Sequence, residues 1–172
     1  MSAAESKIEI RPMNLEDTNT ILSIDGEIRA AGKAITYENL TAEYILSISK
    51  GITARENPAS YVGSLTGNVA ALLDFSFVAD IDGQVRGFVL GQVARLRESA
   101  TEVGVIEMIG VHPDYQRKGI GTKLINALAD KYRSKGIKIM RIGINYRDKS
   151  FLSLVEHAGF SAARLIVYSK IL

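Results

Sequence analysis

The sequence predicts a single α/β (α+β) domain. The 172 residues fit one domain, and an apolar share of 47% is enough to fill a substantial core. Helical and strand-like periodicities follow one another along the chain. Two strand-like runs are joined by Asp82-Gly83, a dipeptide typical of a hairpin turn. We expect the domain to span residues 7–172, after a flexible N-terminus of residues 1–6.

The N-terminal third is predicted to form one strand and two helices. Residues 7–11 alternate around Ile8 and Ile10 until Pro12 stops the strand. Asn14 is a good N-cap for a helix that runs to about residue 31. A second helix is expected from about residue 37 to residue 50, followed by a mobile connection over residues 51–68.

The remaining two thirds change to a β-rich pattern interrupted by helices. The expected elements are strands over 69–81, 85–96, 102–111, 137–144 and 164–169, with helices from about 120 to 136 and over 150–157. The last strand is a lone apolar edge strand. Such an edge invites pairing with another chain, which favours a homodimer; the alternative is a monomer in which the first two helices cover the strand.

The most specific segment runs from Glu107 to Thr122, with the sequence EMIGVHPDYQRKGIGT. It is typical of a strand, a proline-bounded turn and a basic glycine loop that opens a helix. Gly119 and Gly121 let the backbone approach a ligand, and the first helical turn leaves N–H groups unpaired. With Arg117 and Lys118, these donors predict a pyrophosphate site.

Two other phosphate loops do not fit. A P-loop places its lysine after the last glycine, whereas Lys118 precedes Gly119. A dinucleotide fingerprint requires a third glycine where this chain has Leu124.

The segment resembles the acyl-CoA loop of the GNAT superfamily of N-acetyltransferases, and the order of elements over residues 7–171 is similar to that of the family. The resemblance implies a mixed central sheet of six or seven strands flanked by about four helices. It also implies acetyl-CoA as co-substrate. The positions that match the family's cofactor loop are Gln116, Arg117, Lys118, Gly119, Ile120, Gly121 and Thr122.

The resemblance further implies that the pantetheine arm inserts between two parallel strands that splay apart, here 102–111 and 137–144. A bulge in the first strand frees main-chain groups, which by position belong to Ile109, Gly110 and Val111. The side chains of Ile109 and Val111 are predicted to be core. Gly110 fits a place where a ligand crowds the backbone, or a simple bulge glycine.

Glu107 is the candidate general base, because it is a carboxylate within an otherwise apolar strand. Alternation along a strand would place it on the same face as Ile109. The alternative is a charge on an open face, or one paired with a structural arginine.

The sequence departs from the family at the step that protonates the departing thiolate. The family's asparagine and tyrosine positions correspond to Asp148 and Val155. Asp148 is assigned to the cofactor site by that correspondence. Tyr146 is a possible substitute proton donor or a solvent-facing loop residue, and Asn145 contacts the cofactor arm or forms a turn. His112 is predicted to be a loop residue rather than a base.

Composition restricts the other partners. Zero cysteines exclude a thiolate site, two histidines make a zinc site improbable, and we expect no metal. A net charge of +2 does not suggest a nucleic-acid or membrane surface. The N-terminus has no signal-peptide core, and a cytoplasmic protein is expected. Candidate acidic groups for a cationic acceptor are Asp25, Glu27 and Glu38, which are otherwise solvated helix charges.

Three functions therefore compete. The first is an N-acetyltransferase that acts on a primary amine of a small molecule, a protein N-terminus or a lysine. The second is a non-catalytic acyl-CoA-binding sensor or regulatory module, which Val155 favours and Glu107 disfavours. The third, a purely structural domain, leaves the basic glycine loop unexplained.

Overall fold

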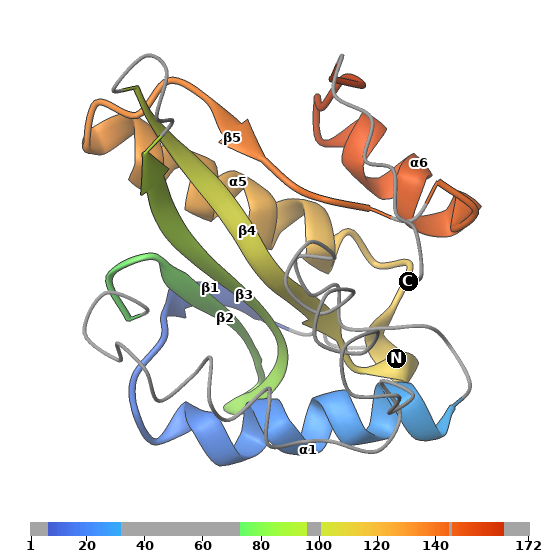
Figure 1. The fold of residues 1–172 in the computed structure, drawn as a ribbon. Coiled ribbons are helices and arrows are strands. Elements are labelled where there is room, and N and C mark those ends of the chain that lie inside the picture. Colours follow the sequence, from blue (N-terminus) through green and yellow to red (C-terminus); the bar gives the residue numbers. More distant parts are fainter. Residues whose placement is uncertain (1–6, 32–72, 96–100, 145, 164–172) are drawn as a thin grey trace, which may run out of the picture.

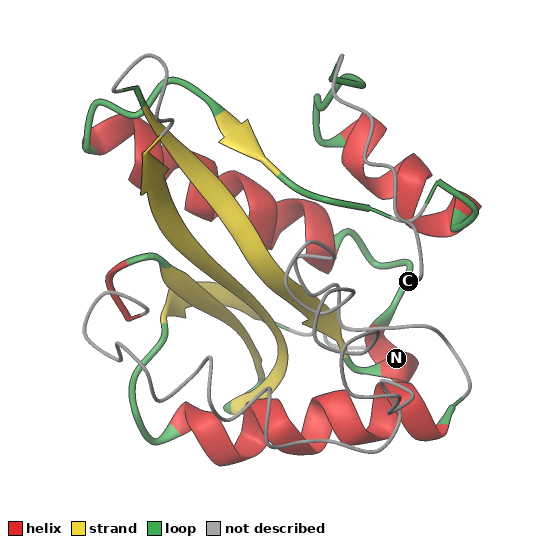
Figure 2. Ribbon diagram, viewed as in Figure 1, coloured by secondary structure: helices red, strands yellow, loops and turns green. Residues whose placement is uncertain are grey.

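A computed structural model describes residues 7–31, 73–95, 101–144 and 146–163. Within them, helices flank one mixed sheet of five strands (Figures 1 and 2). The strands, in chain order and in spatial order, are β1 (Ile8–Pro12), β2 (Ser76–Ile81), β3 (Gln84–Arg95), β4 (Glu102–Val111) and β5 (Met140–Arg141). Neighbours from β1 to β4 are antiparallel, and β5 is parallel to β4. The α-helices are α1 (Asp17–Ala30), α5 (Ile120–Ser134) and α6 (Lys149–His157), and a 3-10 turn, Pro113–Tyr115, follows β4. The predicted α/β class and mixed sheet are confirmed.

The structure corrects several expected elements. The described part of the chain has five strands and three α-helices, not six or seven strands and about four helices. The strand expected over 69–81 begins only at Ser76, and the one expected over 137–144 is reduced to Met140–Arg141. The expected helix over 37–50 and the last strand over 164–169 lie outside the described residues. None of the helices in the described part is both long and apolar enough to cross a membrane.

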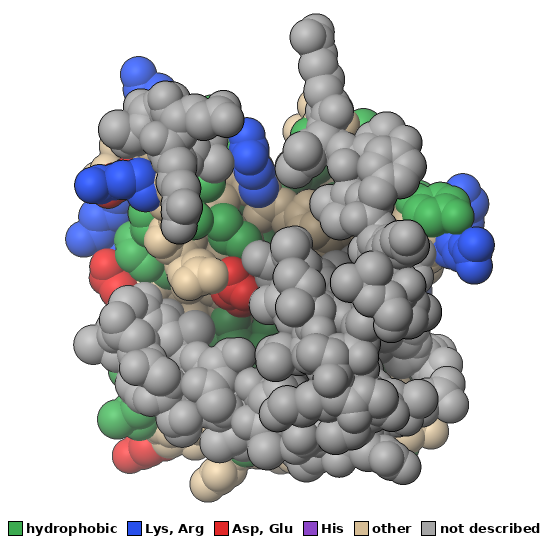
Figure 3. Space-filling view, viewed as in Figure 1, with side chains coloured by type: hydrophobic (Ala, Val, Ile, Leu, Met, Phe, Trp, Pro, Cys, Tyr) green, Lys and Arg blue, Asp and Glu red, His purple; other side chains and the backbone are tan. Residues whose placement is uncertain are grey.

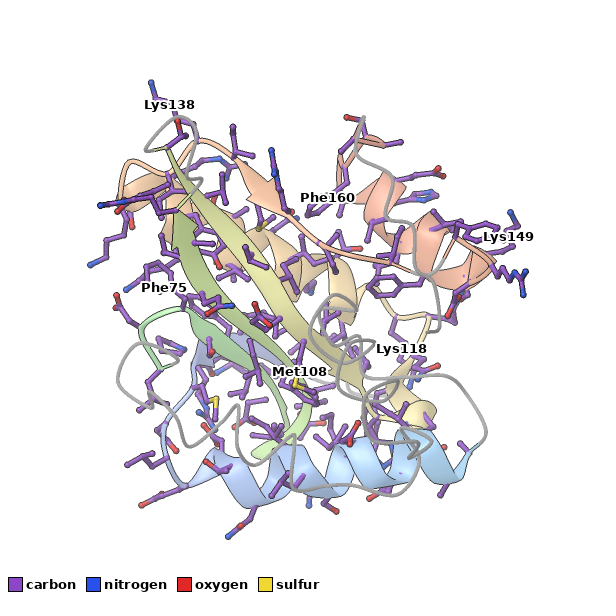
Figure 4. All side chains as sticks on the ribbon, in the orientation of Figure 1. Phe75, Met108, Lys118, Lys138, Lys149 and Phe160 are labelled. Carbon is purple, nitrogen blue, oxygen red and sulfur yellow. The ribbon has the colours of Figure 1, made fainter. Side chains whose placement is uncertain are left out.

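Two apolar cores lie on opposite faces of the sheet. On one face, Ile21, Ile24 and Ile28 of α1 pack against Phe88 and Met108. On the other face, α5 covers the sheet behind β3 and β4 (Figure 1). The helix contributes Ile120, Leu124, Ile125, Leu128 and Tyr132 to this second core, and the strands contribute Ala79, Ile81, Val89, Ile106 and Ile109. Figure 4 shows the Met108 side chain between β4 and α1. The faces of the sheet are named below after α1 and α5.

Polar contacts fix the start of α1. Asn14 caps the helix as predicted, because its side chain accepts a hydrogen bond from the Asp17 N–H (3.2 Å), while the Asp17 carboxylate accepts one from the Asn14 N–H (2.9 Å). Both terminal nitrogens of Arg11 on β1 donate to Asp17 at 2.8 Å. These Arg11 bonds are the main reason that the pKa of Asp17 lies below its ordinary value. The same contact therefore joins α1 to the edge of the sheet.

Candidate active site

The strands β4 and β5 pair only at the start of β4. Gly104 is opposite Met140 and Val105 is opposite Arg141, and the Gly104 N–H donates to the Ile139 carbonyl at 2.9 Å. Beyond Val105, β5 has ended and β4 continues for six residues to Val111. The two parallel strands thus diverge where the sequence predicted a splayed pair, which leaves the β5 side of β4 unpaired with that strand.

A β-bulge lies at the point of divergence. Leu90 on β3 is opposite Met108, whereas the next residue, Gly91, is opposite Ile106, so Glu107 is the extra residue on β4. The predicted bulge is therefore present, and it lies at Glu107, two residues before the main-chain groups of residues 109–111 that the sequence assigned to the cofactor arm. The extra residue also exchanges the faces on which the side chains after Glu107 lie, relative to strict alternation along the strand.

The bulge places Glu107 on the α1 face, and the expectation that it shares a face with Ile109 is wrong. Ile109 belongs to the core beneath α5, whereas Met108 belongs to the core beneath α1. Gln92 follows Leu90 of the α1 core by two residues and therefore shares its face. The Gln92 amide donates to the Glu107 carboxylate, which confirms the side on which Glu107 lies.

Glu107 is partly buried beside an amide. Among the described residues its hydrogen-bond partner is Gln92 and not an arginine. A half-buried carboxylate with one amide donor retains free acceptor positions for a proton or a water. Figure 3, which views the molecule as in Figure 1, shows acidic, polar and hydrophobic side chains exposed together near the middle of this face, with Lys and Arg gathered at its sides.

The main chain after the bulge presents polar groups to the β5 side. The His112 N–H donates to the Arg86 carbonyl on β3 at 2.8 Å. Because main-chain groups alternate in direction along a strand, those of Val111 and Ile109 point away from β3. The Val111 carbonyl accepts a hydrogen bond from the Gln116 amide at 3.0 Å. The N–H and carbonyl of Ile109 therefore point toward the side of β4 on which β5 diverges from it.

Gly110 has a different role from the expected one. A Cβ at this position would lie 2.8 Å from the Phe88 ring and 3.1 Å from Ile28. The absent side chain thus makes room for core packing beneath α1, and not for a ligand. The side chains of Ile109, 3% exposed, and Val111, packed against the same core as α5, are core residues as predicted.

The loop between β4 and α5 forms a turn with two left-handed residues. Arg117 has a φ of 64° and Gly119 a φ of 76°. Gly119 is the N-cap of α5, and no side chain caps the helix. The Lys123 N–H bonds to the Gly119 carbonyl at 3.1 Å, so the N–H groups of residues 120–122 precede the first helical hydrogen bond. Such convergent donors suit an anion.

Two cations flank an aromatic ring beside this loop. The Lys118 ammonium lies 4.9 Å from the centre of the Tyr115 ring, and the Arg86 guanidinium lies 5.2 Å from it. Figure 4 shows Lys118 in the loop that follows the end of β4. The Tyr115 ring thus places positive charge next to the N-terminus of α5.

Gly121 serves helix packing. A Cβ there would lie 3.2 Å from a methyl group of Leu154 on α6. At Gly119, by contrast, a Cβ would meet no atom within 4 Å, and the left-handed backbone is the reason for a glycine there.

The remaining predicted residues, at positions 145–155, have other environments or lie outside the described residues. Tyr146 is 69% exposed, and its hydroxyl accepts a hydrogen bond from Arg147 at 3.1 Å. Asp148 is the N-cap of α6, since its carboxylate accepts from the Phe151 N–H at 2.9 Å. Val155 is buried. Asn145 lies outside the described residues. Asp148 thus has a structural role, and Tyr146 is an exposed turn residue.

Sequence reasoning missed a contact between α1 and the end of β4. His112 is buried, and its Nε2 lies 2.5 Å from the Glu27 carboxylate. His112 Nδ1 accepts a hydrogen bond from the Asp114 N–H at 3.2 Å, so the proton of the neutral ring is assigned to Nε2. Glu27 is therefore held by a ring and is not a purely solvated helix charge. No group of three or more His, Cys, Asp or Glu within the described ranges is placed to hold a metal ion.

The comparisons with known proteins agree with this geometry. The model of the acetyltransferase (GNAT) family matches residues 42–160, more than half of the chain. The chain therefore belongs to the acetyltransferase (GNAT) family, whose members use acetyl-CoA as co-substrate.

Two curated relatives match in part. An uncharacterized N-acetyltransferase of Methanocaldococcus jannaschii is 28% identical over 94 residues, which is 54% of this chain and 42% of the relative. The [ribosomal protein bS18]-alanine N-acetyltransferase of Escherichia coli is 29% identical over 84 residues, which is 49% of this chain and 53% of the relative. The matched segments thus span less than two thirds of either relative.

The fold has solved counterparts. The structure of an aminoglycoside N-acetyltransferase, AAC(6')-Iy, in complex with CoA has a TM-score of 0.65 to this chain. The similarity covers 99% of both chains at 20% identity, which shows the fold alone.

Proposed function

We propose that this chain is an N-acetyltransferase that moves an acetyl group from acetyl-CoA to a primary amine by direct transfer. The observation that supports it most is the position of Glu107. A partly buried carboxylate occupies the bulge of β4, at the point where β5 ends and β4 is no longer paired with it. A proton acceptor and an exposed main-chain edge are the two groups that direct transfer requires.

The donor side uses main-chain groups and the basic loop. We assign the diverging edge at Ile109 to the thioester end of acetyl-CoA, because its N–H and carbonyl face away from β3. We assign the N–H groups of residues 120–122, with Arg117 and Lys118, to the pyrophosphate. The co-substrate itself supplies an acetyl group that is activated as a thioester.

Glu107 acts on the acceptor. An amine with a pKa near that of lysine is mostly protonated at neutral pH and has no free electron pair. Glu107 accepts that proton, directly or through a water, and the neutral nitrogen then forms a bond to the acetyl carbon as the bond to sulfur breaks. The nitrogen gives up a second proton as the amide forms, and the departing thiolate takes up one proton. Tyr146 as the source of that proton stays a prediction.

A non-catalytic acyl-CoA sensor is the alternative. It is favoured by the buried Val155 at the family's tyrosine position and by the exposure of Tyr146. A sensor binds CoA through the same loop but leaves Glu107 without a chemical role. Measuring CoA binding and acetyl-CoA consumption on the same protein separates the two functions.

The test replaces Glu107 by glutamine and uses a panel of amines and peptides as acceptors. For a general base, turnover falls by about 10²–10⁴-fold and the acidic limb of the pH–rate profile disappears, while KM for acetyl-CoA is unchanged. Glu102→Gln is the matched control, since Glu102 is a carboxylate on the same strand that pairs with Arg95 at 3.2 Å. Wild-type turnover and pH dependence in Glu107→Gln would show that the base lies elsewhere.

The acceptor is proposed only as a class. The aminoglycoside and ribosomal-protein enzymes act on amines of different size. Glu27 is tied to His112, so it is less available to a cationic acceptor than the sequence suggested. A homodimer, a cytoplasmic location and the absence of nucleic-acid and membrane partners stay predictions.

A further inference from the structure

Tyr132 joins the two strands next to the bulge. Its side chain rises from α5 and is 2% exposed. The hydroxyl lies 2.8 Å from the Gln92 carbonyl on β3 and 2.9 Å from the Val105 carbonyl on β4. These two residues are opposite each other, and Val105 lies two residues before the bulge residue Glu107. The single hydroxyl proton is thus shared between one carbonyl of each strand, close to the bulge.

Two glycines make room for the ring. A Cβ at Gly104 would lie 2.5 Å from the Tyr132 ring, and a Cβ at Gly91 would lie 2.5 Å from its hydroxyl. Since Gly91 is on β3 and Gly104 on β4, each strand has a gap that the same side chain fills. The Phe75 ring stacks on Tyr132 with centroids 5.1 Å apart. Burial raises the pKa of the Tyr132 hydroxyl, and the Glu107 charge raises it further, so the hydroxyl keeps its proton and remains a donor.

Gln92, which accepts the Tyr132 hydroxyl, also contacts Glu107. The main chain of Gln92 accepts the Tyr132 hydroxyl, and the side chain of Gln92 donates to the Glu107 carboxylate. We propose that Tyr132 and Gln92 are positioning residues for Glu107: Tyr132 fixes the two strands at the bulge, and Gln92 orients the carboxylate on the α1 face. Neither residue touches substrate. This inference rests on the proposed role of Glu107 as the base.

The first test replaces Tyr132 by phenylalanine, which keeps the ring and removes only the bridge. We expect kcat to fall by about tenfold, because small misplacements of a catalytic group are costly, with KM for acetyl-CoA within about twofold of the wild-type value. Amide exchange at residues 105–108 of the free protein should become about tenfold faster. This second readout needs no turnover.

The second test replaces Gln92 by leucine, which removes the amide donor to Glu107. Because Gln92 is exposed, this variant should fold and serves as the test if Tyr132→Phe does not fold. We expect kcat to fall while KM for acetyl-CoA stays unchanged, because the Glu107 carboxylate loses the amide that orients it. In a Glu107→Gln background, neither substitution should lower kcat further. Ile81→Val is the control, since Ile81 belongs to the same core as Tyr132 but lies on β2, and its kcat should equal that of the wild type.

Several outcomes would overturn the proposal. The proposal fails if Tyr132→Phe and Gln92→Leu keep the wild-type kcat, or if they lower kcat equally with and without Glu107. Unchanged amide exchange in Tyr132→Phe also contradicts it. If instead Glu107→Gln keeps full turnover, the base itself is wrong and the positioning role fails with it. Loss of turnover in Glu107→Gln alone would retain the base and refute only the positioning.

Discussion

Replacing Asp17 by asparagine should destabilise the fold in a pH-dependent way. The Asp17 side chain is 7% exposed, and its carboxylate accepts two hydrogen bonds of 2.8 Å from Arg11 and one of 2.9 Å from the Asn14 N–H. Asparagine keeps the shape but removes the charge, and its amide nitrogen cannot accept a hydrogen bond. Arg11 is then left with Asp80, at 3.5 Å, as its remaining acidic partner among the described residues.

The size of the effect follows from burial. Removing one partner of a buried pair costs about 3–5 kcal/mol, and charge-assisted hydrogen bonds contribute about 1.5–3 kcal/mol each. The Arg11 side chain is 29% exposed, so water recovers part of its hydration. We therefore expect a loss of about 2–3 kcal/mol in the free energy of unfolding at pH 7. For a domain of this size the corresponding fall in Tm is roughly 5–10 °C.

The pH dependence has a definite sign. The pKa of folded Asp17 lies below its ordinary value of 3.8, mainly because of the Arg11 hydrogen bonds. The charged carboxylate therefore stabilises the native state above the unfolded pKa, and this contribution is lost as pH falls through the lower, folded pKa. The difference between wild type and Asp17→Asn should be constant from pH 7 to about pH 5 and shrink below pH 4.

Urea unfolding at pH 7, 5 and 3 measures this difference. Asp80→Asn is the matched control, because Asp80 contacts the same guanidinium at a longer distance and should lose less than about 1 kcal/mol. A loss below about 0.5 kcal/mol in Asp17→Asn would refute the reasoning, since that is the range of ordinary surface substitutions. A large loss that does not change with pH would assign the effect to packing and not to charge.

Two further predictions concern glycines. In Gly119→Ala, the φ of 76° costs a side chain about 1–2 kcal/mol, so relaxation of the turn should weaken CoA binding by about tenfold in calorimetry; unchanged affinity in a folded variant would remove the turn from the binding site. In Gly104→Ala, the new Cβ meets the Tyr132 ring at 2.5 Å, so unfolding should show a loss of about 1–3 kcal/mol. Tyr132→Leu should lower the free energy of unfolding less in the Gly104→Ala background than in the wild type. Strictly additive losses would contradict the contact between position 104 and the Tyr132 ring.

The parts of the site that depend on local sequence could be predicted. The hairpin turn at Asp82-Gly83 joins β2 and β3 as expected, and both residues adopt positive φ. The left-handed Gly119 at the start of α5 was likewise encoded by its own loop. In each case the residue type restricts the backbone of its immediate neighbours, so the signal needs no information about distant segments.

The phase of β4 could not be predicted in the same way. A period of two placed Glu107 with Ile109, but the extra residue at the bulge puts them on opposite faces. The bulge is defined by Leu90 and Gly91 on the neighbouring strand, and nothing within residues 102–111 marks its position. The predicted length of β5 was wrong for a related reason. The apolar run over 137–144 does not indicate how many of its residues pair with β4.

Contacts between distant segments explain the misread glycines. From its own strand, Gly110 fits either a crowding ligand or a simple bulge, whereas in the fold Phe88 and Ile28 occupy the space that a side chain would take. Gly91 and Gly104 drew no attention in the sequence, because their reason is a tyrosine on α5. A glycine in a strand indicates close approach, but only the fold identifies what approaches.

The position of α1 links the stability of the fold to the face that carries Glu107. Arg11 holds the start of the helix through Asp17, and His112 holds its last turns through Glu27. The apolar residues between these points pack against Met108, the neighbour of Glu107. His112 also directly precedes the 3-10 turn that leads into the basic loop, so the same residue contacts α1 and adjoins the loop. Because these contacts are distributed over β1, β4 and α1, the geometry around Glu107 depends on the whole sheet and not on the bulge alone.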